Sequence, residues 1–214
     1  MKTLLATIAT ITLTTYIAKA DLMTFEDLPA PTQSYQHDNG IDFEVLPSMY
    51  NGFSWTTQQN SPYFGNGWGY YDMKEWDFGG YDNGIIDNRA LYSPYGGGYA
   101  AGYLISNTAY WMFTSAYFTS AWANSGGAAI HIDGYLGDQA VYTYTATIYR
   151  SHKTLVVPPQ LMIDRVHIWG GYVGVTGEHW IMDDMSYGLV PAPSSIALLG
   201  LVGLIGRRRR GETQ

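Results

Sequence analysis

The stretch Gln139-Ala140-Val141-Tyr142-Thr143-Tyr144-Thr145-Ala146-Thr147-Ile148-Tyr149 decides the fold class of this chain. β-Branched and aromatic residues fill it almost completely, a composition typical of strands. Further strand-like runs are found at 22–28, 41–45, 99–105, 110–114, 117–122, 128–135, 154–157, 161–169 and 178–187. Helical periodicity with capping residues does not occur between them. About eight to ten short strands in a region of this length predict an all-β fold, a single antiparallel β-sandwich of the jelly-roll type.

The strands occupy residues 21–188, which we expect to form one domain. Residues 51–98 differ from the rest of this region, because Gly, Asn, Tyr and Trp dominate and aliphatic residues are few. This composition predicts long loops with no more than two short strands. A turn is expected at Leu136-Gly137-Asp138, between two of the strand-like runs.

Residues 1–20 have the pattern of a secretory signal peptide. Met1-Lys2 is a short positive start, residues 4–17 are apolar and threonine-rich, and Ala18-Lys19-Ala20 fits the small-x-small cleavage pattern. We therefore expect export through the secretion machinery, cleavage by signal peptidase after Ala20, and a mature chain that begins at Asp21.

Residues 189–214 form a second non-core segment. The motif Val190-Pro191-Ala192-Pro193 precedes an apolar run at 194–206, and Arg207-Arg208-Arg209-Arg210 follows it. A helix of this length spans ~20 Å, short of the ~30 Å hydrocarbon core, so flanking arginines would have to reach the interface. An arginine cluster favours the cytoplasmic side, which places the rest of the chain outside.

This three-part tail resembles the PEP-CTERM sorting signal of Gram-negative bacteria, with Ala192 where the motif usually has Glu. The resemblance implies an exosortase as a partner, anchoring in the inner membrane before processing, then location at the cell surface or in an extracellular polysaccharide matrix. The alternative is a single-pass membrane protein whose tail stays uncleaved. The segment 110–149, the closing run 180–185 and the opening Phe25-Glu26-Asp27-Leu28 are also similar to uncharacterised domains carried by PEP-CTERM proteins, and at the level of the fold they resemble the sandwiches of carbohydrate-binding modules.

The composition limits the classes of partner. Residues 21–190 carry 17 acidic and five basic residues, a formal charge of −12, so nucleic acid is not an expected partner. The chain has no cysteine, which excludes disulfides and thiolate chemistry.

Two acidic pairs suggest a structural calcium ion. Glu26-Asp27 and Asp183-Asp184 lie on the first and last strand-like runs, whose ends often lie side by side in a sandwich. Carboxylate oxygens are suitable ligands for Ca²⁺, which would also remove the repulsion between the pairs. The alternative is that one residue of each pair faces solvent and no ion binds.

Aromatic side chains of the 51–84 segment suggest a glycan-stacking platform, built mainly from Trp55, Trp68, Tyr70 and Trp76. Their rings could stack on the C–H faces of sugars. The alternative is that they cover the core beneath long loops. No catalytic residues are predicted, because the five histidines have no metal-binding spacing and no nucleophile motif is present. The leading hypothesis is therefore a non-enzymatic, exported structural or adhesive protein that binds polysaccharide, and the rival is a surface glycoside hydrolase.

Overall fold

The computed structural model describes residues 20–34, 42–57, 68–72, 89–93, 102–120, 127–170, 172–173, 176–177 and 179–190. All regular structure in these ranges is β-strand, and every pairing between strands is antiparallel. The predicted all-β antiparallel class is confirmed. The described residues include no helix long and apolar enough to cross a membrane, and the predicted segment 194–206 lies outside them.

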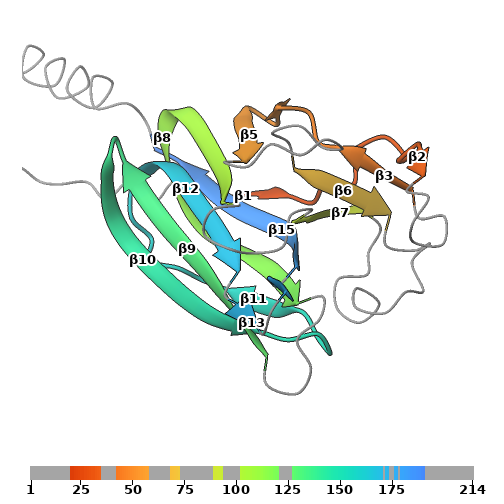
Figure 1. The fold of residues 1–214 in the computed structure, drawn as a ribbon. Helices are drawn as coiled ribbons and strands as arrows, with labels where there is room; N and C mark the ends of the chain where they lie inside the picture. Colours follow the sequence, from red (N-terminus) through yellow and green to blue (C-terminus); the bar gives the residue numbers. More distant parts are fainter. Residues whose placement is uncertain are drawn as a thin grey trace, which may run out of the picture.

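The longest strand, β8 (Tyr103–Ser120), organises the fold because it belongs to two layers (Figure 1). Its first half, at residues 103–106, pairs with β5 (Phe53–Thr57) on one edge and with β12 (Ile163–Gly170) on the other. Its second half, at residues 116–118, lies between β15 (Trp180–Leu189) and β11 (Thr154–Val156).

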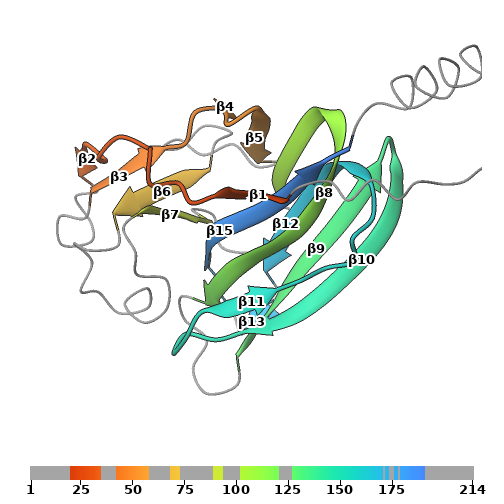
Figure 2. The same cartoon turned by 180° about the vertical axis from the view of Figure 1, so that it is seen from behind.

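The first layer continues from β12 to β9 (Ala128–Leu136) and ends at β10 (Gln139–Ile148), while β4 (Met49–Tyr50) pairs with β5 at its other end. The second layer extends from β15 through short strands, namely β1 (Ala20–Met23), β7 (Arg89–Tyr92), β6 (Gly69–Asp72), β3 (Asp42–Val45) and β2 (Gln33–Ser34). A separate ribbon joins β13 (Tyr172–Val173) to β14 (Thr176–Gly177). Figure 2 shows β1 lying along β15 on the side of the molecule away from β9.

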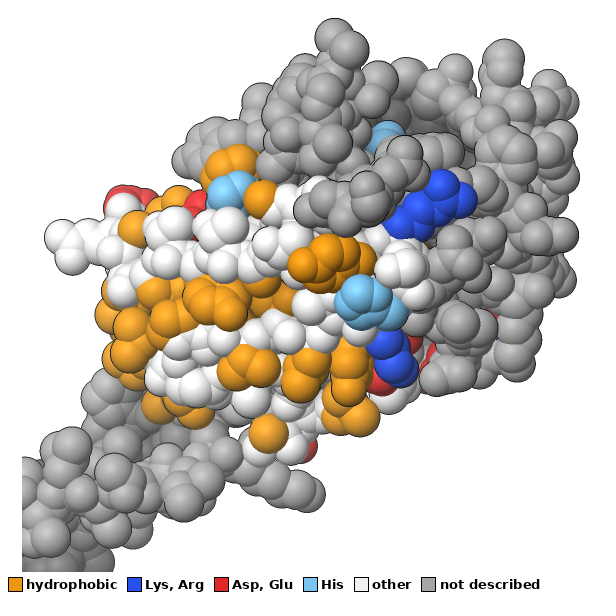
Figure 3. Space-filling model, turned by 90° about the horizontal axis from the view of Figure 1, so that it is seen from below, with side chains coloured by type: hydrophobic (Ala, Val, Ile, Leu, Met, Phe, Trp, Pro, Cys, Tyr) orange, Lys and Arg blue, Asp and Glu red, His pale blue; other side chains and the backbone are white. Residues whose placement is uncertain are grey.

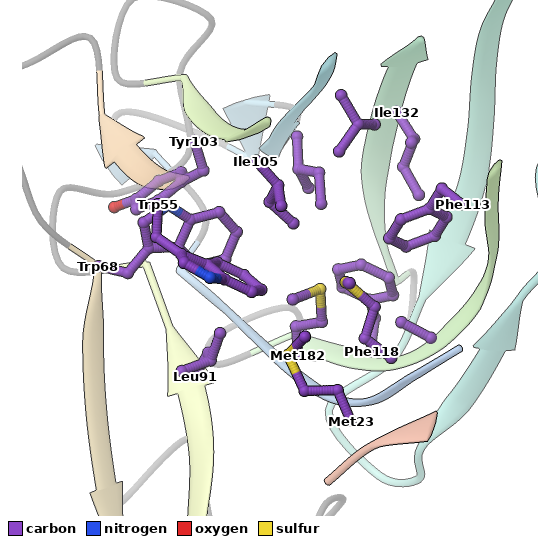
Figure 4. Packing of buried hydrophobic residues seen from close by; sticks show 14 of the residues in the cluster. Met23, Trp55, Trp68, Leu91, Tyr103, Ile105, Phe113, Phe118, Ile132 and Met182 are labelled. Carbon is purple, nitrogen blue, oxygen red and sulfur yellow. The ribbon is translucent and has the colours of Figure 1, made fainter. Parts of the chain in front are cut away.

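A single hydrophobic core lies between the two layers (Figure 4). Alternate residues of β9, such as Ile130 and Ile132, point into it from the first layer, and Phe118 and Met182 point into it from the second. Because successive strand residues point to opposite faces, the residues between these positions lie on the outer surfaces of the sandwich.

The structure corrects two details of the expected fold. The three runs predicted between 99 and 122 are one strand, β8, and the region 51–98 contains three strands, β5, β6 and β7, rather than at most two. The cause of the second difference is that tyrosine and tryptophan supply the buried apolar side chains that aliphatic residues supply elsewhere. In addition, β8 joins the layers into one continuous hydrogen-bonded sheet, whereas a jelly roll has two separate sheets.

Candidate functional site

The aromatic residues predicted to stack on glycans are core residues. Trp55 and Trp68 are 0% exposed and Tyr70 is 1% exposed. The two indole rings pack edge to face with centroids 5.1 Å apart, and Figure 4 shows both pointing into the core. A ring enclosed on both faces cannot stack on a sugar. The alternative reading of these three residues is therefore the correct one, and Trp76 lies outside the described residues.

Backbone carbonyls satisfy the polar edges of these buried indoles. The Trp55 Nε1–H donates to the Tyr50 carbonyl at 3.0 Å, and the Trp68 Nε1–H donates to the Thr56 carbonyl at 3.1 Å. A buried tryptophan needs such a partner, since its N–H would otherwise lose its hydrogen bond to water. These contacts fix both rings as structural elements.

The segments that carry the two acidic pairs lie side by side. Strand β1 pairs with β15 with Met23 opposite Met185, so the segment after β1 lies beside Asp183 and Asp184. The Glu26 Oε1 accepts a hydrogen bond from the Arg89 backbone N–H at 3.2 Å. The described residues contain no group of three or more histidine or carboxylate side chains placed to hold a metal ion.

Protein groups also form hydrogen bonds with the carboxylates of Asp27 and Asp183. The Tyr50 hydroxyl donates to Asp27, and the Asp184 N–H donates to the Asp183 Oδ1 at 2.7 Å. Asp183 is only 5% exposed. Burial raises the pKa of its carboxyl to about 7, opposed by the hydrogen bond from Asp184 and reinforced by the charges of Asp184 and Glu26. The Asp183 carboxyl therefore stays protonated at pH values well above those at which an aspartate usually ionises.

The predicted processing sites fall mostly outside the described residues. Ala20 and Asp21 are the first two residues of β1, while Ala18 is not described. Val190 donates its N–H to the Tyr110 carbonyl at 2.8 Å, directly after β15. The remaining residues of the sorting signal lie outside the described ranges, namely Pro191, Ala192, Pro193, Arg207, Arg208, Arg209 and Arg210.

A different surface, the outer face of β9 and β12, carries the densest group of interacting polar and aromatic side chains. Cross-strand pairing places His131 opposite Trp169 and Asp133 opposite His167. The rings of His131 and Trp169 stack with centroids 3.7 Å apart and an interplanar angle of 13°. We call His131, Asp133, His167 and Trp169, with Tyr135 and Arg165 beside them, the β9–β12 face.

Asp133 connects the members of this face. Its Oδ2 accepts a hydrogen bond from the Trp169 Nε1–H at 3.0 Å and lies 3.9 Å from the His167 Nδ1. Its Oδ1 is buried and has no hydrogen-bond partner among the described residues. On β10, the Thr145 hydroxyl lies 2.9 Å from the His131 Nδ1. These contacts hold the Trp169 ring at one orientation.

Both histidines of the face are neutral at neutral pH. Burial lowers the pKa of His131 and of His167, and the nearby Asp133 carboxylate opposes this effect without cancelling it. The Arg165 guanidinium lies 4.9 Å from the centroid of the Tyr135 ring. The partly exposed side chains of the face are those of His131, Tyr135, Arg165 and Trp169, whereas Asp133 and His167 are buried. Such a set can donate and accept hydrogen bonds without a strong net field.

Glycine is required behind this face. A Cβ at Gly102, directly before β8, would overlap the imidazole of His167, and a Cβ at Gly134 would overlap the ring of Tyr142. The sequence also contained a signal for this face. Aliphatic residues alternate with polar or aromatic residues in Ile130-His131-Ile132-Asp133 and in Val166-His167-Ile168-Trp169. Only the pairing of β9 with β12 shows that the polar and aromatic residues of both runs meet on one surface.

Comparison with known proteins gives distant structural likeness alone. No protein-family model and no curated protein matches the sequence. The xylan-binding domain CBM22-1 of Paenibacillus barcinonensis Xyn10C is 9% identical, with a TM-score of 0.37, over 82% of this chain and 97% of that domain. The enzymatically active domain of bacteriophage CBA120 tailspike protein 4 is 12% identical, with a TM-score of 0.29, over 65% of this chain and 20% of that one.

Proposed function

We propose that this chain is an exported, non-catalytic surface protein that binds polysaccharide through the β9–β12 face. The observation that carries the proposal is the stacked pair of His131 and Trp169, oriented by the hydrogen bond from the indole to Asp133. The Trp169 side chain is half-buried, so part of its ring is accessible from solvent. An oriented, partly exposed ring beside the exposed hydroxyls of β10 is suited to a sugar, and the buried Asp133 carboxylate fixes its orientation.

The charge of the face favours a neutral glycan over a strongly anionic one. The imidazoles are uncharged at neutral pH, and Asp133 and Arg165 contribute one charge of each sign. The excess of acidic residues over the domain as a whole would also repel a polyanion. Sugar hydroxyls could exchange hydrogen bonds with Thr143 and Thr145, which are exposed on the neighbouring strand β10.

The binding test compares the protein with three variants on a panel of neutral polysaccharides, including β-glucans, xylans and mannans, by affinity electrophoresis. Trp169→Ala should abolish retardation, and Trp169→Phe should retain part of it because a ring remains. The matched control is Tyr117→Ala, which removes an aromatic side chain from the second layer and should leave retardation unchanged. Equal binding by the protein and by Trp169→Ala would refute this site.

The export and sorting part of the proposal is supported by the signal-peptide pattern and the three-part tail. In this scheme an exosortase processes the chain at the inner membrane and releases it to the cell surface or the matrix. Mass-spectrometric mapping of the C-terminus in cell fractions tests it. A terminus near 191–193 supports processing, whereas Gln214 in the membrane fraction supports an uncleaved anchor.

A glycoside hydrolase is the second candidate, and one observation favours it. The raised pKa of Asp183, near a second carboxylate at Glu26, is the property that a general acid of a glycosidase needs. Release of reducing sugars from a bound polysaccharide, lost in Asp183→Asn, would favour the hydrolase. Retention without release supports the binding protein.

A further inference from the structure

Strand β10 forms one margin of the first layer, and beyond the β-bulge between Ala140 and Tyr142 it lacks the features that protect sheet edges. Among the described residues, β10 hydrogen-bonds to β9 alone. Its ten residues include no charged residue and no proline. Proteins commonly protect a long edge strand with charges, prolines or a covering segment, because unpaired backbone groups otherwise recruit another strand. We propose that β10 pairs antiparallel with β10 of a second copy of this chain, which joins two first layers into one sheet.

The side chains of β10 support the pairing. Val141, Tyr144 and Ala146 pack against the core but remain partly exposed, so the core is incompletely covered at this margin. A second β10 laid alongside would remove more of this apolar surface from water. On the outer face, Thr143, Thr145 and Thr147 are exposed and form a row of residues well suited to cross-strand contact.

The distribution of charge selects this edge for contact between two copies of an acidic chain. No acidic residue occurs from Gln139 to Ile163, and that span includes the basic residues Arg150 and Lys153. Seen from below in Figure 3, hydrophobic and uncharged side chains make up most of the described surface, and acidic side chains lie toward its margins. Two copies that approach here avoid the repulsion that they would meet elsewhere.

The faces of the strand restrict the register. Residues opposite each other in a sheet share a face, so Thr143 and Thr145 must meet odd-numbered residues of the second copy. With Tyr144 on the two-fold axis, the residues from Tyr142 to Ala146 of the two strands pair regularly, and the β-bulge between Ala140 and Tyr142 interrupts the alternation beyond them. Asp138 precedes β10 and Arg150 follows it, so the antiparallel pair brings each of them near the other residue of the second copy, at two symmetric positions. These complementary charges favour a register centred near Tyr144.

Pairing through β10 would also join two of the proposed polysaccharide sites in one dimer, a consequence that rests on the proposed function although the pairing itself does not. The two-fold axis of such a pair runs perpendicular to the sheet, so both β9–β12 faces lie on the same side. Two glycan sites on one surface would bind a polymer more tightly than one site, because the second contact becomes intramolecular.

Cysteine crosslinking of the full chain tests the pairing directly, because the chain has no cysteine of its own. Mixing a Thr143→Cys chain with a Thr145→Cys chain under mild oxidation should give a disulfide-linked heterodimer if Tyr144 lies on the axis. Self-crosslinking of either variant alone would place the axis at that residue, and would also support pairing through β10. The matched control, Thr108→Cys, carries the same change at an exposed position of β8. The proposal is overturned if no combination of the Thr143→Cys and Thr145→Cys chains crosslinks more than the control does.

Charge exchange tests the register independently by sedimentation velocity. Asp138→Lys and Arg150→Glu should each weaken dimerisation about tenfold, since like charges then meet at two symmetric positions. The double variant should recover the original dissociation constant because the pair is restored with its signs exchanged. A protein that sediments as a monomer at all concentrations would refute the dimer. Because neither readout involves a glycan, failure here leaves the proposed polysaccharide site to be judged by its own test.

Discussion

Replacing Asp183 by Asn should stabilise the protein at neutral and alkaline pH, although it removes a buried carboxylate from a hydrogen bond. Asp183 is 5% exposed, and burial raises the pKa of its carboxyl from 3.8 to about 7. At pH 8 the folded protein must therefore carry a buried charge that the unfolded chain keeps in water. Asparagine carries no charge at any pH, and its Oδ1 can still accept the Asp184 N–H.

The size of the effect follows from linkage between protonation and folding. The pKa of the Asp183 carboxyl rises from 3.8 to about 7, and each pKa unit corresponds to about 1.36 kcal/mol. Ionisation of this buried carboxyl therefore lowers the unfolding free energy by up to about 4 kcal/mol. Below about pH 4 the carboxyl is protonated in both states and no penalty exists. Between about pH 4 and pH 7 the unfolded state ionises first, so stability falls as pH rises, and above about pH 7 the penalty is constant.

The assay is urea unfolding of the protein and of Asp183→Asn at pH 4, 6 and 8. The difference in unfolding free energy between the two should be small at pH 4 and should grow to a few kcal/mol in favour of the variant at pH 8. Asp21→Asn, at an exposed position of β1, is the matched control and should change little at any pH. A variant that is less stable than the protein at pH 8 would refute the reasoning. If this loss occurred only with added Ca²⁺, it would instead favour the predicted calcium site.

Three further outcomes are expected. Trp55→Ala should lower the unfolding free energy by about 3–5 kcal/mol, because it leaves a cavity in the core, and thermal and urea unfolding would measure it. Gly102→Ala should destabilise the protein by about 1–3 kcal/mol, since the new methyl group displaces His167, and wild-type stability would contradict the packing described for this face. On the sorting proposal, replacement of Arg207–Arg210 by serine should misplace the protein, as fractionation and immunoblotting would show, because the positive cluster that is proposed to stay cytoplasmic is lost. Unchanged localisation and processing of this last variant would count against the sorting proposal.

The strands that alternate aliphatic and polar residues were predictable from the sequence. The runs at 128–135 and 161–169 correspond to β9 and β12, and the stretch at 139–149 corresponds to β10. The turn between β9 and β10 was predictable as well, because glycine is common in turns. Gly137 in this turn adopts a positive φ of 59°, which glycine tolerates without strain. These features depend on local side-chain chemistry and backbone sterics, both of which are visible in a short window of sequence.

Residues 51–98 show the limit of local reasoning. An abundance of Trp, Tyr and Gly left open whether the rings stack on glycans or cover the core, and the structure encloses Trp55, Trp68 and Tyr70 in the core. The same amphipathic ring can cover a surface or fill an interior, and its choice depends on which strands lie opposite it. Here Tyr103 and Trp180 supply those neighbours, with ring centroids 5.0 and 5.7 Å from that of Trp68.

The candidate site was predictable only in part, because its contacts also depend on which strands lie next to each other. The sequence by itself determined the all-β class, the positions of the main strands, the acidic charge and the absence of cysteine, since each depends on composition or on residues close together in the chain. The tertiary structure decided that His131 stacks on Trp169, that Asp133 receives the indole N–H, and that Asp183 is buried beside Glu26. Each of these contacts joins residues more than 30 positions apart, and only the register of paired strands brings them within reach.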